Sequence, residues 1–429
     1  MQRHLGLSDA QYAYLVAGLY TAYSVPNFVL PCICSFAAQR YGEKRILMLT
    51  LGIAVLGQLV FAASLHEGMQ PLMIPGRVLI GIGSEVPGVI ANAIVTRWFY
   101  DEHLTLALAM LLCISRLGSV ATSVVIPRLT GAYSIPTATW ISTIIALTVT
   151  SSCAIYILIM GNAVSEKEEE KFPVPCYRES FSRLPGVFWL LSIICVATYG
   201  CLVPFNNSAQ RFLASRFYDG NESAAGLAVG IPNTLVGVLA LPFGLLLELP
   251  RLRSCRSPIL FSGGLILIAH LCFLQTIGPV IPLVLLGVGY ASFTVAFWPM
   301  VASIILNHIV EAPESCTPLL EASRTSYEHP NLGLDRVSGE SEENLSGLGK
   351  GANDSLVVIG YGIMTSLLNL SMGVVPILLA GMETWCGFSG LGIVFVALAT
   401  ISVIASTRLV SLDREAKMTK KQTGCPGAE

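Results

Sequence analysis

Charged residues are scarce in this sequence. Asp, Glu, Lys and Arg make up 12% of its 429 residues, and hydrophobic residues make up 53%. A typical soluble domain carries about 25% charged residues, so half of the expected charge is missing. The mean hydropathy is +0.68. This composition excludes a soluble enzyme and a disordered regulator, and it predicts an integral membrane protein.

An excess of basic residues is also missing. The 25 Lys and Arg against 27 Asp and Glu give a formal net charge of −2, which indicates no nucleic-acid partner. The twelve cysteines form no C-x-x-C pair, and no His/Cys spacing suits zinc. We therefore predict no metal and no cofactor. The sequence contains no nucleophile–base pattern, so we do not expect an enzyme.

Long apolar stretches are the most prominent feature of the sequence. A membrane-spanning helix needs about 20 predominantly apolar residues, and such windows recur along the chain. We predict eleven spans, at 11–37, 46–65, 72–97, 104–130, 136–160, 187–212, 224–248, 257–277, 279–306, 355–381 and 386–408.

Two hydrophilic breaks divide these spans. The first predicts a linker at 162–186, between an N-terminal bundle of five spans at 1–161 and a C-terminal bundle of six at 187–408. The second, at 309–354, is rich in Glu, Ser, Gly and Asn, which is typical of a disordered insertion. A short tail follows at 409–429.

Basic residues gather on one side of the predicted membrane. The loops at 38–45 and 249–256, the linker, the insertion and the tail counted from Arg408 together carry eighteen Lys and Arg, whereas the opposite loops carry three. Cytosolic loops carry an excess of Lys and Arg. We therefore predict that the linker, the insertion and the C-terminus are cytosolic and that the N-terminus lies on the other side.

Away from their ends, the predicted spans contain three charged residues: Arg77, Glu85 and Arg116. A charge at the bilayer centre costs about 2.5–3.5 kcal/mol even on insertion scales, so such residues face a bundle interior or a wet cavity. Glu85 and Arg116 are near the middle of their spans. Together they could hold a zwitterion, with Glu85 on its ammonium group and Arg116 on its carboxylate. Alternatively, the two side chains pair with each other and only fix helix packing.

Several polar and aromatic residues could line the same cavity. Each is also a common packing or interhelical hydrogen-bonding residue, and that alternative stays open. The candidates are Tyr23, Asn27, Asn92, Tyr199, Trp298 and Asn369.

An ordered set of segments carries a family resemblance. It includes Tyr20-Thr-Ala-Tyr-Ser-Val-Pro-Asn27, Gly81-Ile-Gly-Ser-Glu85, Ser115-Arg-Leu-Gly-Ser119, Ala296-Phe-Trp-Pro-Met-Val301 and Tyr361-Gly-Ile-Met364. These resemble the lysosomal dipeptide transporter branch of the major facilitator superfamily. The resemblance implies two six-helix bundles and alternating access. With five plus six spans, we expect that the first helix of the family is missing from this sequence.

The resemblance also implies a function. It implies export of dipeptides from the lysosome or an equivalent acidic compartment, with Glu85 and Arg116 binding the peptide termini. It implies a lysosomal or vacuolar membrane, and either a glycosylated accessory membrane protein or a homodimer as partner. The antiporter-type Gly-Pro stretch is missing from the 104–130 span, which favours uniport or symport over exchange, and of these we expect uniport.

The family's gating loop is altered here. It reads Ser35-Phe-Ala-Ala-Gln-Arg-Tyr-Gly42, so Gln39 replaces the usual acidic residue while Arg40 keeps the basic one. Glu248 matches the acidic counterpart in the second half. The resemblance therefore implies a gating role for Arg40 and Glu248.

Two other functions fit the same sequence. One is a transporter of this fold with another small cargo, such as an amino acid, a sugar or an organic anion. The other is a non-transporting receptor or scaffold that signals through the 309–354 insertion.

Overall fold

The computed structural model describes residues 5–100, 102–163, 181, 183–249, 252, 255–275, 278–311 and 340–423. Within these residues every assigned element is a helix, so the predicted all-α class is confirmed. The elements are α2 (Asp9–Ser24), η1 (Pro26–Phe28), α3 (Leu30–Tyr41), α4 (Glu43–His66), α5 (Gln70–Phe99), α6 (Leu104–Ala132), α7 (Ile135–Ala163), α9 (Gly186–Phe217), α10 (Glu222–Leu247), α12 (Ser257–Leu274), α13 (Val280–Glu311) and α15 (Glu340–Thr423).

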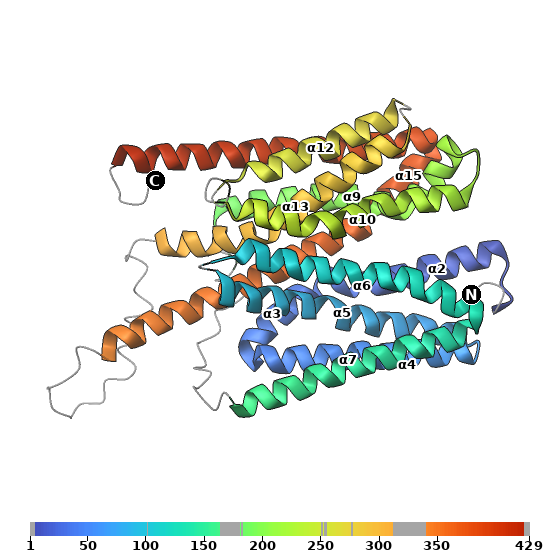
Figure 1. The fold of residues 1–429 in the computed structure, drawn as a ribbon, viewed down its shortest axis with the longest axis horizontal. Helices are drawn as coiled ribbons and strands as arrows, with labels where there is room; N and C mark the ends of the chain where they lie inside the picture. Colours follow the sequence, from blue (N-terminus) through green and yellow to red (C-terminus); the bar gives the residue numbers. More distant parts are fainter. Residues whose placement is uncertain are drawn as a thin grey trace.

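Most of the predicted spans are long apolar helices. In the described residues, nine stretches are long and apolar enough to cross a membrane, and a bent pair of helices makes a tenth. The remaining predicted span is α6, where the apolar helical stretch is Leu104–Ser119. α15 contains two of the nine stretches, Ser355–Leu379 and Gly390–Thr419, and the chain turns back between them (Figure 1).

The first predicted span, 11–37, is broken at its middle. α2 ends at Ser24, a 3₁₀ turn begins at Pro26, and the following α3 contains Pro31. Each proline lacks the N–H that would continue the helical hydrogen bonds. The two halves of the span therefore meet at an angle of 51°.

The helices form two bundles. α4 packs against α5 and α7 in the first, and α9 packs against α15 in the second, where α10 and α12 both pack against α13. The bundles meet along α6 with α10 and along α3 with α15. The predicted boundaries at 161, 187 and 408 remain predictions.

The helix ends alternate as the spans predict. Figure 1 shows the end of α7, the starts of α9 and α15, the end of α13 and the C-terminus at one end of the molecule, with the N-terminus at the other. The distribution of basic residues predicts that the first of these ends faces the cytosol. We call it the cytosolic end.

The 309–354 segment differs from the expectation of a disordered insertion. α13 continues to Glu311, and α15 begins at Glu340, so both borders of this segment are helical. The remainder, 312–339, lies outside the described residues.

Candidate substrate site between the two bundles

Glu85 is half-buried on α5 and is held by a tyrosine from α2. The Tyr23 hydroxyl donates to Glu85 Oε1 at 2.9 Å, and the Ser84 hydroxyl donates to the Tyr23 oxygen at 2.9 Å. Gly81 permits this approach, because a Cβ there would collide with the Tyr23 backbone carbonyl. The Glu85 side chain is therefore held in a fixed position by Tyr23.

Arg116 reaches from α6 to the other bundle. Its Nη2 donates to the Tyr290 hydroxyl on α13 at 2.6 Å, and its guanidinium carbon lies 5.2 Å from the centroid of the same ring. Its Nε is buried and has no hydrogen-bond partner. A guanidinium offers five donors, so this one can still bind an anion.

Glu85 and Arg116 do not pair with each other. Both are described residues, and the contacts of each side chain lead elsewhere, Glu85 to Tyr23 and Arg116 to Tyr290. The alternative in which the two charges neutralise each other to fix helix packing is therefore wrong for this structure. Each of the two side chains is held by a tyrosine hydroxyl instead.

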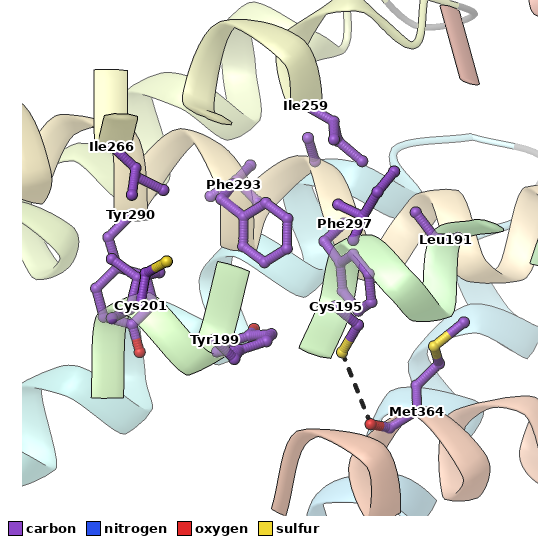
Figure 2. Packing of buried hydrophobic residues seen from close by; sticks show 14 of the residues in the cluster. Leu191, Cys195, Tyr199, Cys201, Ile259, Ile266, Tyr290, Phe293, Phe297 and Met364 are labelled. Carbon is purple, nitrogen blue, oxygen red and sulfur yellow. Dashed lines mark hydrogen bonds between the residues drawn. The ribbon is translucent and has the colours of Figure 1, made fainter. Parts of the chain in front are cut away.

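Tyr199 belongs to an aromatic cluster beneath Tyr290. Figure 2 shows Tyr199 beside Phe293 and Phe297, with ring centroids 5.3 Å and 6.1 Å away, and Tyr290 is 6.4 Å away. Tyr199 is almost fully buried at 4% exposure. These edge-to-face contacts favour a fixed ring arrangement, so Tyr199 supports the Arg116–Tyr290 contact by packing.

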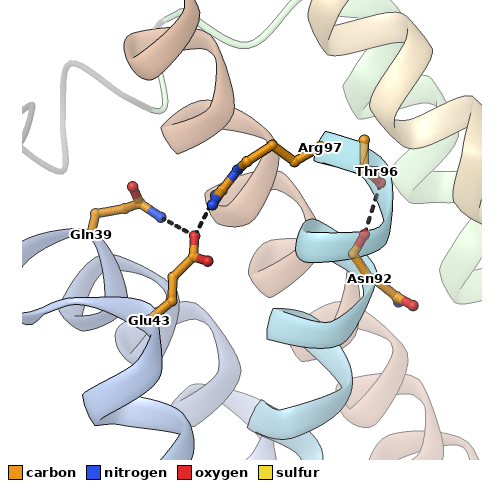
Figure 3. Close-up of polar contacts among 5 residues, drawn as sticks. All are labelled: Gln39, Glu43, Asn92, Thr96 and Arg97. Carbon is orange, nitrogen blue, oxygen red and sulfur yellow. Dashed lines mark hydrogen bonds and ion pairs between the residues drawn. The ribbon is translucent and has the colours of Figure 1, made fainter. Parts of the chain in front are cut away.

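Trp298 and Asn92 take part in a second contact between the bundles. The Thr96 hydroxyl on α5 donates to the Asn92 carbonyl at 2.8 Å and is 2.8 Å from the Tyr361 hydroxyl on α15. Tyr361 in turn donates to the Trp298 carbonyl at 3.3 Å. Figure 3 shows that the Asn92 side chain points away from Thr96, so its backbone makes this contact.

The two other asparagines donate to backbone carbonyls four residues earlier in the chain. Asn27 Nδ2 donates to the Tyr23 carbonyl at 3.1 Å, and Asn369 Nδ2 donates to the Thr365 carbonyl at 2.9 Å. Both residues are fully buried. Their positions agree with the packing alternative for these two candidates.

The two gating candidates lie at the cytosolic end. Glu248 Oε1 accepts from the backbone N–H of Leu106 at 3.1 Å, which joins α10 to the start of α6. The guanidinium of Arg40 lies 5.6 Å from the ring of its neighbour Tyr41. Glu248 thus bridges the bundles, whereas Arg40 is exposed.

A carboxylate is also present beside the altered gating loop. Glu43 Oε1 accepts from Arg97 at 2.6 Å and from Gln39 at 3.5 Å (Figure 3). Glu43 lies four residues after Gln39 in the sequence. An acidic group is therefore present at the first residue of α4, where its ion pair with Arg97 joins the cytosolic ends of α4 and α5.

The sequence did not single out several of these partners. Tyr290 and Thr96 are ordinary residues for an apolar span and carry no pattern of their own, whereas Ser84 and Tyr361 lie in segments of the family resemblance but had no assigned role. Glu43 could have been found, because an acidic residue close to Gln39 offers an alternative partner for a basic side chain.

Comparison with known proteins identifies the family. The sequence profile of the Major Facilitator Superfamily matches residues 1–312. The chain belongs to the Major Facilitator Superfamily. Its predicted fold of two helical bundles is confirmed, since it resembles the crystal structure of a bacterial homologue of the iron transporter ferroportin. The TM-score is 0.66 at 15% identity, over 95% of this chain and 92% of that one.

Relatives within this superfamily share one name. A zebrafish (Danio rerio) protein named lysosomal dipeptide transporter MFSD1 is 29% identical over 306 residues, 68% of this chain and 65% of the relative. The mouse (Mus musculus) protein of the same name is 24% identical over 414 residues, 92% of this chain and 78% of the relative. The match thus spans just under two thirds of the zebrafish relative. The predicted resemblance to this branch is confirmed.

Proposed function

We propose that this protein is a transporter, not an enzyme, and that it moves dipeptides across the membrane by alternating access. One observation carries the proposal: two opposite charges lie inside the spans, unpaired with each other, and each is held by a tyrosine hydroxyl. An unneutralised intramembrane charge is costly. A zwitterionic cargo would compensate both charges at once.

A cargo that binds both charges must span two helices. Glu85 is on α5 and Arg116 is on α6, and these helices contact each other. The termini of a dipeptide are separated by two residues, or about 7 Å of extended chain. We propose that Glu85 binds the ammonium group and Arg116 the carboxylate, with Tyr23 and Tyr290 as positioning residues.

The remaining candidates have supporting roles in this proposal. Tyr199 packs beneath Tyr290, and Trp298 and Asn92 lie in the contact between α5, α13 and α15. Glu248 holds the cytosolic ends of α6 and α10 together. Arg40 remains a predicted gating residue.

The names of the relatives support the cargo and the compartment. Both are named lysosomal dipeptide transporters, and we infer a lysosomal or vacuolar membrane for this chain as well. Uniport, and either a glycosylated accessory protein or a homodimer as partner, stay predictions from the family resemblance.

Uptake into proteoliposomes tests the proposal. Labelled dipeptide uptake should saturate and should be competed by other dipeptides but not by single amino acids, sugars or monocarboxylates. An imposed pH gradient should leave the rate unchanged for a uniporter. Uptake competed by an amino acid, a sugar or an organic anion would assign another cargo. No uptake of any of these by folded protein would favour the receptor or scaffold alternative.

A further inference from the structure

Two asparagines meet between α9 and α10 in the second bundle. Asn233 Nδ2 donates to Asn206 Oδ1 at 3.5 Å, and both residues are half-buried. Hydrogen bonds of this kind usually measure about 2.7–3.2 Å, so this one is weak and contributes little to joining the two helices. Polar groups within a membrane need hydrogen-bond partners, because lipid offers none. The pair is therefore poorly explained by helix packing alone.

Asn233 lies on the face of α10 that meets Arg116. Gly237 on this face is close to Arg116, since a Cβ added to the glycine would be 3.7 Å from the Arg116 Cβ. Asn233 is four residues earlier on α10, so it shares this face. It lies one turn, or about 6 Å, further from the cytosolic end.

The guanidinium of Arg116 lies at a similar level. A Cβ added to Gly287 of α13 would be 2.8 Å from Leu235 Cδ1, so α13 packs closely against α10 at this height. Tyr290 follows Gly287 by three residues and accepts from Arg116 at 2.6 Å. The Arg116–Tyr290 contact is therefore within about one helical turn of Asn233 along the bundle.

The amide pair complements a peptide group. Each Asn side chain has an NH₂ donor and a carbonyl acceptor. Among the described residues, the two side chains hydrogen-bond only to each other, which leaves the Asn233 oxygen and an N–H of Asn206. A peptide group supplies the matching N–H and carbonyl. Its nitrogen is about 2.5 Å from the carboxylate carbon of a dipeptide, so a carboxylate bound at Arg116 brings the peptide group toward this pair.

We propose that Asn206 and Asn233 bind the peptide group of the cargo. The Asn233 oxygen accepts from the peptide N–H, and the Asn206 amide donates to the peptide carbonyl. The inference rests on the proposed function, because it takes the carboxylate of a dipeptide to lie at Arg116. It also explains selection against single amino acids, which carry both charged termini but no peptide group. A site that hydrogen-bonds a substrate N–H rejects an analogue that lacks it.

A matched pair of competitors tests the inference. Ala-Ala and its ester analogue, alanyl-lactate, differ only where an ester oxygen replaces the peptide N–H. Each is added to proteoliposomes that take up labelled Ala-Ala. We expect half-maximal inhibition of the parent protein to need about tenfold more of the ester, because the ester leaves the Asn233 oxygen without a donor. Equal inhibition by the two compounds overturns the inference, and this measurement needs no variant.

The double variant Asn206→Leu with Asn233→Leu removes both amides. Leucine is similar in size and suits a membrane helix, and the thermal midpoint of unfolding shows whether the variant is folded. We expect both compounds to inhibit it equally, through weaker inhibition by Ala-Ala. A folded double variant that keeps the tenfold difference overturns the inference.

Two further variants separate the amides from their surroundings. Thr234→Val is the matched control, because Thr234 is exposed and shares a face of α10 with Val238, which is 64% exposed. It should keep the tenfold difference. Tyr290→Phe should weaken inhibition by both compounds alike, since both carry the carboxylate that Arg116 binds. Loss of the difference in Thr234→Val would overturn the assignment to the asparagines.

Failure of the proposed function gives a different result. If the folded parent shows no saturable Ala-Ala uptake, the dipeptide proposal is wrong and this inference is wrong with it. Saturable uptake with equal inhibition by the two compounds would keep the dipeptide proposal and refute only the role of the two asparagines.

Discussion

At the scale of single residues, the site depends on tyrosines that hold charges without neutralising them. A hydrogen bond to a charged group contributes about 1.5–3 kcal/mol, which offsets part of the cost of an intramembrane charge. Tyr23 does this for Glu85 and Tyr290 does it for Arg116. An ion pair between the two charges would have removed the attraction for a cargo.

Glu85→Gln tests the ammonium half of the clamp. The amide has nearly the same shape and can still accept the Tyr23 hydrogen bond, so only the charge is lost. We expect the rate of dipeptide uptake to fall at least tenfold while the thermal midpoint of unfolding changes little. Glu67→Gln, an exposed change just beyond α4, is the matched control. Parent-like uptake by Glu85→Gln would remove Glu85 from the site.

Tyr290→Phe tests the positioning of Arg116. The substitution keeps the ring beneath the guanidinium but removes the hydroxyl that accepts at 2.6 Å. We expect the KM for dipeptides to rise about tenfold, as the loss of one hydrogen bond to a charge predicts, with a much smaller change in kcat. Tyr41→Phe is the control, since Tyr41 also lies near an arginine but at the surface. A change in kcat alone would assign Tyr290 to a conformational step.

The sequence could predict the charges of the site but only part of their surroundings. Glu85 and Arg116 stand out because charges are rare inside spans. Tyr290 does not, since a tyrosine in an apolar helix is common. Its role depends on the way α13 passes α6, and this is a property of the tertiary fold.

At the scale of helices, small residues set how closely the elements approach. A Cβ on Gly57 would lie 2.6 Å from the backbone nitrogen of Ile80, so α4 and α5 touch at the backbone. Gly81 likewise lets α5 and α2 approach closely, because a Cβ there would collide with the backbone of Tyr23. Close contact through small residues is a main source of helix association in membranes.

Gly81→Ala tests this approach against a control on the same helix. The added methyl group would collide with the Tyr23 carbonyl and push α2 away from α5, whereas Gly88 has open space at its Cβ. We expect Gly81→Ala to cost about 1–3 kcal/mol of stability, as overpacking typically does, and to lower dipeptide uptake. Gly88→Ala should leave both unchanged. Thermal unfolding in detergent and uptake assays measure the two effects, and equal behaviour of the variants would refute the steric argument.

The elements themselves were largely predictable. Windows of about 20 apolar residues located the spans because a membrane imposes both length and composition. The 51° bend was not predicted, although Pro26 and Pro31 were visible, because proline bends some membrane helices and is tolerated in others. The helical start at Glu340 was also missed, since a Gly- and Ser-rich composition is typical of loops.

At the scale of the whole molecule, contacts between the bundles gather toward the cytosolic end. Hydrogen bonds join the bundles at Cys32 with Ser366, Thr96 with Tyr361, Tyr100 with Asn307, Leu106 with Glu248, Cys113 with Gly237 and Arg116 with Tyr290. Leu106 is near the cytosolic start of α6, and Arg116 is ten residues, or about 15 Å, further along. These described contacts hold the two bundles against each other in the cytosolic half of the molecule, and alternating access would have to open this closure of the bundles.

Ser366→Cys tests whether this closure must open during transport. The Ser366 hydroxyl accepts from the backbone N–H of Cys32 at 3.1 Å, so a cysteine at 366 lies close enough to the native Cys32 thiol to form a disulfide after small adjustments. The crosslink would join α3 to α15 across the interface between the bundles. We expect an oxidant to abolish dipeptide uptake and a reductant to restore it fully.

The control is Ser366→Cys in a protein that lacks the Cys32 thiol. In a Cys32→Ala background, Ser366→Cys cannot form the crosslink, and oxidation should leave uptake unchanged. Cleavage at a protease site inserted between α7 and α9 would show the crosslink directly, because the two halves stay joined only when it has formed. Full uptake by crosslinked protein would mean that α3 and α15 stay together throughout the cycle. The hydrogen bonds made by Cys32, Thr96 and Tyr100 all join the first bundle to the second bundle in this region. If they stayed closed throughout the cycle, the cargo would have to leave between α6 and α10 instead.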